Sequence, residues 1–192
     1  MKKLILSLLA IHIVFSALAQ SPSGAQSKII TDSIHSKVLN TYRAYNVFLP
    51  KSYETDTNKK YPVLYLLHGM TDTNQAWSGR GHLQDVADQL IESGEACEMI
   101  IVTPNAGGNI YAGVWNGYFD MPGWSYETFF YTEFLPYIEK NYRVIGNKAN
   151  RAIAGLSMGG GGATCYGQKH SEMYAAVYAM SALMSIPELG AA

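Results

Sequence analysis

Charged residues are scarce in this chain, and no run of one sign occurs. Lysine and arginine together number 14 and aspartate and glutamate 15 among 192 residues, which leaves a net charge of −1. Nucleic acids and anionic membrane surfaces attract clustered basic side chains. We therefore expect neither a nucleic-acid partner nor a membrane-surface partner, and the length suits one domain with a sizeable core.

Cofactor signatures are also missing from the sequence. No cluster of histidine, cysteine, aspartate and glutamate has the spacing of metal ligands, and no dinucleotide-binding glycine pattern occurs. The run Gly159–Gly162 resembles a phosphate-binding loop, but no lysine followed by serine or threonine comes after it. We expect no metal and no cofactor.

Cysteine is rare, with only Cys97 and Cys165 in the chain. An oxidising compartment would permit a disulfide between them. Both lie in apolar sequence contexts, which favours two buried free thiols.

One apolar run stands out, close to the N-terminus. Two lysines precede the apolar stretch 4–15, and Ala17-Leu18-Ala19 has the small residues of a cleavage site. The stretch is short for a membrane span and His12 interrupts it, although an uncleaved anchor is the alternative. The pattern predicts a signal peptide over 1–19, export to a periplasm or out of the cell, and no membrane contact after cleavage.

The rest of the chain alternates between strand and helix patterns. Residues 20–40 are rich in small polar residues and predict a flexible lead-in to one domain over 41–192. Tyr42–Leu49 alternates and ends at Pro50, which predicts an edge strand. Buried strands are expected at 62–67, 99–102, 152–154 and 174–180, and helices at 82–93, from Ser125 with a kink at Pro136, and at 158–170. This alternation is typical of a mostly parallel, doubly wound α/β sheet.

The pentapeptide Gly155-Leu156-Ser157-Met158-Gly159 carries the chemistry. It fits the G-x-S-x-G nucleophile elbow, in which a serine sits on a strained strand-to-helix turn and glycines allow strand and helix to approach. Ser157 is the candidate nucleophile. The N–H of Met158 is one candidate oxyanion donor, and the N–H of Met70, after the tight turn at Gly69, is the second.

A base for Ser157 is not recognisable. His170 is the only later histidine, and a continuous helix would place it roughly 20 Å away. His68 ends a neighbouring strand, where shaping the oxyanion turn is favoured over acting as base. His35 and His82 are expected on the surface. Two loop acids, Asp72 and Asp120, either bind sugar hydroxyls at the mouth of the site or are simply solvated.

Several segments together resemble one family. YPVLYLLHG, a downstream Trp77, MIIVTPN, FLPYIEKNYRV and RAIAGLSMGGGGA are similar to the esterase D superfamily of α/β-hydrolases. That group includes feruloyl and acetyl-xylan esterases of carbohydrate esterase family one, enterochelin esterases, S-formylglutathione hydrolases and mycolyltransferases. The resemblance implies an α/β-hydrolase fold, Ser157 as nucleophile, and the N–H groups of Met70 and Met158 as oxyanion hole.

The same resemblance implies that something is missing. Family members carry their acid and histidine on strands beyond the one at 174–180. We therefore expect a C-terminally truncated domain that lacks the last strands and helix, and self-association through the incomplete sheet edge.

The function expected is that of a secreted serine carboxylester hydrolase working through an acyl-enzyme on Ser157. Export and the aromatic loop 111–124 favour feruloyl or acetyl esters of plant polysaccharide, although these aromatics could instead cap the core. One alternative is a catalytically inactive truncated fold or binding module. Another is an acyltransferase or a siderophore or thioester hydrolase of the same superfamily.

Overall fold

The computed structural model describes residues 25–108, 113–114 and 116–184. The predicted signal peptide and part of the aromatic loop lie outside them. None of the helices in this part of the chain is long and apolar enough to cross a membrane.

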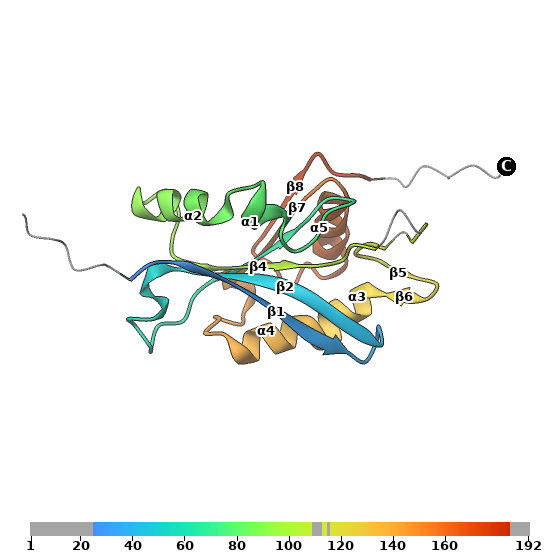
Figure 1. Cartoon of the computed structure of the whole chain (residues 1–192), viewed down its shortest axis with the longest axis horizontal. Coiled ribbons are helices and arrows are strands. Elements are labelled where there is room, and N and C mark those ends of the chain that lie inside the picture. The colour runs from blue at the N-terminus through green and yellow to red at the C-terminus, as the bar shows by residue number, and fades with distance from the viewer. Residues whose placement is uncertain (1–24, 109–112, 115, 185–192) are drawn as a thin grey trace, which may run out of the picture.

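A six-stranded sheet forms the centre of the described fold, in the order β1-β2-β4-β3-β7-β8 (Figure 1). The strands are β1 (Lys28–Ser36), β2 (Thr41–Leu49), β3 (Val63–Leu67), β4 (Ile100–Pro104), β7 (Arg151–Leu156) and β8 (Ala176–Met180). β2 pairs antiparallel with β1 and β4, whereas β4, β3, β7 and β8 are parallel to one another. The predicted mostly parallel sheet is confirmed.

Helices cover both faces of this sheet, as predicted for a doubly wound fold. They are α1 (Ala76–Gly79), α2 (Leu83–Glu92), α3 (Tyr126–Phe129), the π-helical turn η3 (Phe130–Phe134), α4 (Leu135–Asn141) and α5 (Met158–Lys169). Two 3-10 turns, η1 (Lys51–Tyr53) and η4 (Lys148–Asn150), and a small ribbon of β5 (Asp120–Met121) and β6 (Trp124–Ser125) complete the elements. In Figure 1, α1 and α2 lie on the opposite side of the sheet from α3 and α4.

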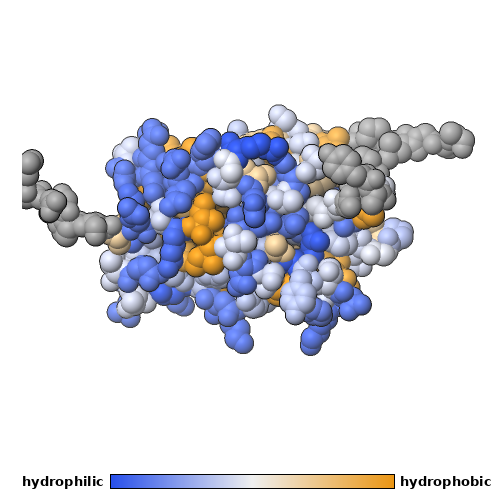
Figure 2. Space-filling model, viewed as in Figure 1, coloured by the Kyte–Doolittle hydropathy of each residue, from blue (hydrophilic) through white to orange (hydrophobic). Residues whose placement is uncertain are grey.

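Successive residues of a strand point to opposite faces of the sheet, and each face has its own hydrophobic core. In β3, Tyr65 and Leu67 join the larger core with the α3, α4 and α5 residues, while Leu66 joins a smaller core with Leu83 and Ala87 of α2. This is the period-two pattern of a sheet buried on both faces. Apolar side chains gather inside, and the face drawn in Figure 2 is largely hydrophilic with limited apolar areas.

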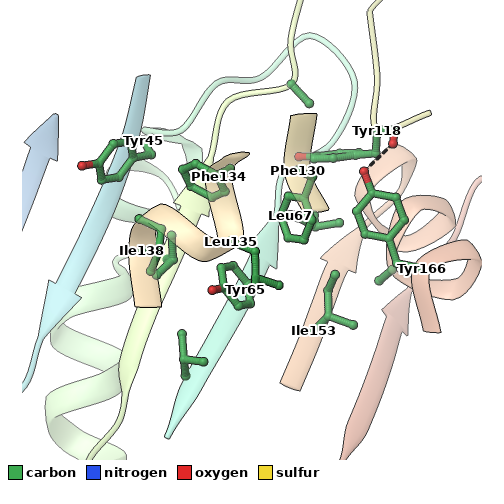
Figure 3. Packing of buried hydrophobic residues seen from close by; sticks show 14 of the residues in the cluster. Tyr45, Tyr65, Leu67, Tyr118, Phe130, Phe134, Leu135, Ile138, Ile153 and Tyr166 are labelled. Carbon is green, nitrogen blue, oxygen red and sulfur yellow. Dashed lines mark hydrogen bonds between the residues drawn. The ribbon is translucent and has the colours of Figure 1, made fainter. Parts of the chain in front are cut away.

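Aromatic rings fix α5 behind the predicted nucleophile. Phe130 packs 5.4 Å from Tyr65 and 5.1 Å from Tyr166 between ring centroids. The Tyr166 hydroxyl donates to the carbonyl of Tyr118, as the dashed line in Figure 3 marks. Rings in such tilted and edge-on contacts add to the free energy of burial, so α5 is held firmly against the sheet.

The N-terminal part differs from expectation. Residues 28–36 form β1, which pairs with β2 from Lys28↔Leu49 to Ser36↔Thr41, so this stretch of the predicted flexible lead-in is ordered strand. β2 is consequently an interior strand, and Pro50 lies just beyond it without breaking the ladder. The polar composition of β1 reflects its place at the sheet edge, where side chains meet solvent.

The expected burial of β8 is wrong. β8 was expected to be buried, yet Tyr178 is 66 % and Val177 43 % exposed, because β8 is the outermost strand of the described sheet. Pro136, predicted to kink its helix, lies in the first turn of α4, directly after the π turn η3, where the loss of its N–H is accommodated.

Candidate active site

Ser157 lies on the turn that joins β7 to α5. Its backbone has φ 55° and ψ −114°, a conformation that non-glycine residues rarely adopt. A Cβ on Gly155 would lie 2.2 Å from the Gly159 carbonyl oxygen, and one on Gly159 would lie 2.5 Å from the Leu67 carbonyl oxygen. Only glycine permits this approach of β7, β3 and α5, so the strand–turn–helix geometry of an elbow is present.

Hydrogen bonds hold the strained turn in place. The Ser157 N–H donates to the Met180 carbonyl at 2.9 Å, and the Ser157 carbonyl accepts from the N–H groups of Gly161 at 3.0 Å and Leu183 at 2.9 Å. The segment that follows β8 therefore braces the elbow. Met158 begins α5, so its N–H belongs to the free first turn of that helix.

The turn after β3 lies beside the elbow. Leu67 of β3 is level with Gly155 of β7, so the residues two positions further along each chain meet. The position of a Cβ on Gly69 is 3.7 Å from the Ser157 Cβ and 3.6 Å from the Leu156 carbonyl oxygen. This register brings the Gly69–Met70 peptide next to Ser157, which is where a second oxyanion donor is needed.

His68 is 1 % exposed and uses both ring nitrogens. Nδ1 donates to the Gly69 carbonyl at 2.8 Å, because a carbonyl only accepts, and Nε2 accepts from the Ala106 N–H at 3.0 Å. Burial lowers the pKa of His68 to about 4, which keeps the ring neutral. His68 therefore links the oxyanion turn to the chain after β4 and has no lone pair left for Ser157.

The remaining histidines lie elsewhere. His170 directly follows α5, packs against Tyr131 in a tilted contact with ring centroids 3.9 Å apart, and lies 3.5 Å from Glu127. The 12 residues of α5 separate it from Ser157 by about 18 Å. His35 and His82 are exposed. Among the residues that the structure describes, no histidine is placed to take the Ser157 proton.

The two loop acids have different places. Asp120 accepts from the Thr128 N–H at 3.0 Å and hydroxyl at 2.6 Å, so it stabilises the start of α3. Asp72 pairs with Arg80, and its Oδ2 lies 3.7 Å from the same Gly69 Cβ position that Ser157 approaches. Asp72, unlike Asp120, therefore lies beside the turn at Gly69 that Ser157 also approaches.

Sequence reasoning missed Arg43. From β2 its guanidinium donates to the carbonyls of Asn105 at 2.7 Å and Gly107 at 3.1 Å and lies 4.9 Å from the Trp124 ring centroid. It thus holds the chain that carries Ala106, the partner of His68. A charged residue inside an apolar strand pattern was the signal available.

A cavity of 190 Å³ opens beside the elbow. It is lined by His68, Gly69, Asp72, Ala76, Trp77, Arg80, Gly81 and Leu156.

No group of three metal-ligating side chains occurs in the described ranges. Both cysteines are free thiols, but Cys97 is exposed and Cys165 half-buried, so the expectation of two buried thiols is wrong for Cys97.

Comparisons with known proteins agree with this geometry. The Esterase family model, described as "Putative esterase", matches residues 36–188. A solved ferulic acid esterase is 74 % identical with a TM-score of 0.83, over 89 % of this chain and 63 % of its own. A ferulic acid esterase of carbohydrate esterase family one from Anaeromyces mucronatus is 28 % identical with a TM-score of 0.69, over 81 % of this chain and 58 % of its own.

A curated relative is the endo-1,4-beta-xylanase/feruloyl esterase of Xylanibacter ruminicola, 35 % identical over 118 residues. Those residues are 60 % of this chain and 16 % of the relative, so the chain spans less than two thirds of each protein compared. With the family match over most of the domain and the same fold in the solved structures, the chain belongs to the Esterase family, within the esterase D superfamily of α/β-hydrolases.

Proposed function

We propose that this chain carries the nucleophile of a secreted serine carboxylester hydrolase that acts on feruloyl or acetyl esters of plant polysaccharide. The observation that supports it is the strained Ser157 at the start of α5, beside the Gly69–Met70 peptide. Similarity to a 74 % identical ferulic acid esterase favours the feruloyl group.

In this proposal the Ser157 hydroxyl oxygen attacks the ester carbonyl carbon. The carbonyl oxygen becomes an oxyanion that accepts hydrogen bonds from the N–H groups of Met158 and Met70. Collapse of the tetrahedral intermediate breaks the bond to the alcohol, which leaves with a proton, and an acyl-enzyme remains on Ser157. Water then attacks the acyl-enzyme, releases the acid and restores the hydroxyl.

The base that takes the Ser157 proton belongs, by the family resemblance, to strands that would follow β8. His68 is excluded from this role because both of its ring nitrogens are engaged, and His170 is excluded by its place at the far end of α5. We propose that the acid and histidine come from such a further section of the fold.

Export is part of the same proposal and rests on the sequence pattern of residues 1–19. Expression of the full chain with its N-terminus intact in a secreting host tests it. The mature protein is expected to begin at Gln20, as read by mass spectrometry of the exported fraction. Retention of the intact N-terminus on membranes would instead support an uncleaved anchor.

Labelling by a fluorophosphonate probe, together with hydrolysis of methyl ferulate, tests the role of Ser157. A protein in which this chain is joined to the proposed section with the acid and histidine is expected to react with the probe, and Ser157→Ala in that protein to lose both reactions. Ser93→Ala is the matched control, because that hydroxyl lies on the surface at the end of α2 and bonds only nearby groups. If that protein neither labels nor turns over substrate, the alternative of an inactive fold or binding module is favoured.

A further inference from the structure

The cavity beside the elbow has the dimensions of a site for one ring. Its 190 Å³ is below the roughly 300–1,000 Å³ of sites for drug-sized ligands. Leu156, which immediately precedes Ser157, forms one wall and is 39 % exposed. Ser157 itself does not line the cavity, but Gly69 does, and a Cβ on Gly69 would lie 3.7 Å from the Ser157 Cβ. A ligand in this cavity would therefore lie next to the turn that carries the candidate nucleophile.

One wall of the cavity is an aromatic ring in a fixed orientation. The Trp77 indole N–H donates to the Leu67 carbonyl at 3.3 Å, at the end of β3. Gly81 lies against the same residue, since a Cβ there would be 3.1 Å from Trp77 Cε3 and 2.7 Å from its carbonyl oxygen. The indole thus presents a preformed apolar surface to the cavity.

Charged hydrogen-bonding groups are supplied to the cavity by the ion pair between Asp72 and Arg80. The Asp72 side chain is 18 % and the Arg80 side chain 76 % exposed. A guanidinium has five N–H donors and a carboxylate about four acceptor sites, so their pairing leaves donors and acceptors for a ligand. Groups of this kind form strong, directional hydrogen bonds with hydroxyls.

These features together suit a sugar ring, which has an apolar C–H face and several hydroxyl groups. An aromatic acyl group has few polar atoms and would use fewer of these donors and acceptors than the hydroxyls of a sugar. Resting on the proposed function, we propose that Trp77, Asp72 and Arg80 form a subsite for the monosaccharide whose hydroxyl is esterified. They would determine specificity for the alcohol part of the substrate.

Binding measured by NMR tests this subsite without requiring turnover. The Trp77 indole N–H resonance, assigned through Trp77→Phe, is followed while methyl α-L-arabinofuranoside or methyl β-D-xylopyranoside is added. One of these sugars is expected to give a saturable shift, with a Kd on the order of millimolar. Arg80→Met and, as a second variant, Asp72→Asn are expected to weaken binding at least tenfold.

The matched control is Lys51→Met, which removes an exposed ion pair with Glu92 on another part of the surface. It should bind the sugar as the unmodified chain does. The subsite is overturned if neither sugar gives a saturable shift or if both variants bind normally. A saturable shift with ferulic acid alone would identify the cavity as an acyl site and would equally overturn the proposal. Because binding is read directly, loss of ester hydrolysis would contradict only the proposed function.

Discussion

Ser157 can take its place on the elbow only because the nearby residues Gly155 and Gly159 have no side chain. Gly159 packs so closely on β3 that a methyl group would lie 2.5 Å from the Leu67 carbonyl oxygen and 2.6 Å from that of His68. Both atoms are backbone and cannot rotate away. The position of the nucleophile relative to the oxyanion turn is thus set by a missing side chain.

Gly159→Ala is expected to destabilise the fold by about 1–3 kcal/mol, since overpacking forces β3 and α5 apart. Gly79→Ala is the matched control because it also lies in a helix but meets nothing within 4 Å. There alanine should be neutral or stabilise by up to about 1 kcal/mol. Urea denaturation measures both, and equal effects would contradict this account of the elbow.

His68 gives the folded chain a dependence on pH. Its pKa is about 4 in the fold and 6.5 in an ordinary environment. Between these values the unfolded chain binds a proton that the folded chain does not. The free energy of unfolding should therefore fall as pH drops from about 6.5 to 4, by at most about 1.4 kcal/mol per pH unit.

Denaturation at pH 7, 6 and 5 measures this slope. The contribution of His68 is the difference in slope between the unmodified chain and His68→Gln, which keeps a donor and an acceptor but does not titrate. Identical slopes in the two proteins would show that His68 is not buried in its neutral form.

At the scale of elements, β7 is tied to α4 by a buried ion pair. Arg151 begins β7 and pairs with Glu139 at 2.7 Å, with side chains 7 % and 17 % exposed, and it also donates to the Met173 carbonyl at 2.9 Å. These contacts anchor the N-terminal end of β7, whose C-terminal end leads into the elbow. They also hold the chain that leads into β8.

Arg151→Met should destabilise the fold by up to roughly 3–5 kcal/mol, because it removes the partner of Glu139, whose side chain is only 17 % exposed. Lys51→Met, which breaks an exposed pair, should cost less than about 1 kcal/mol. Thermal unfolding of the two variants compares them. A loss at Arg151 no larger than that at Lys51 would mean that the pair does not anchor β7.

For the whole molecule, the sheet edge at β8 governs behaviour in solution. Val177 and Tyr178 are exposed on opposite faces of this strand, and its outer side has no paired strand among the described residues. Unpaired strand edges with apolar side chains are templates for further pairing. We expect self-association through β8 unless a further section of the fold covers it.

Sedimentation velocity across a range of concentrations tests this expectation. The unmodified chain should associate increasingly with concentration, and Tyr178→Lys should shift it toward monomer because a charge opposes pairing at the edge. Tyr42→Lys is the control, since Tyr42 is 68 % exposed on β2 and Tyr178 66 %. A chain that stays monomeric at every concentration would contradict self-association.

Local patterns were enough to predict most of the fold. The apolar runs at 62–67 and 152–154 and the helical spacing at 82–93 lie within or close to β3, β7 and α2, because period and composition reflect burial on one or both faces. The glycines around Ser157 likewise revealed the elbow, since only glycine tolerates that approach. Sequence alone therefore determined the alternation of buried strands and helices, the elbow and the family resemblance.

Tertiary structure decided what depends on distant partners. β1 has a polar sequence without a strand pattern, and it forms a strand because it pairs with β2. β8 is apolar yet exposed, because burial of its side chains would require another element packed over them. The engagement of both His68 nitrogens depends on Gly69 and on Ala106, 38 residues away. Asp72 and Asp120 are both loop acids in the sequence, and only folding places Asp72 beside the turn at Gly69 and Asp120 at the start of α3. The reason is that contacts between elements, rather than neighbours in the chain, set the environment of a side chain.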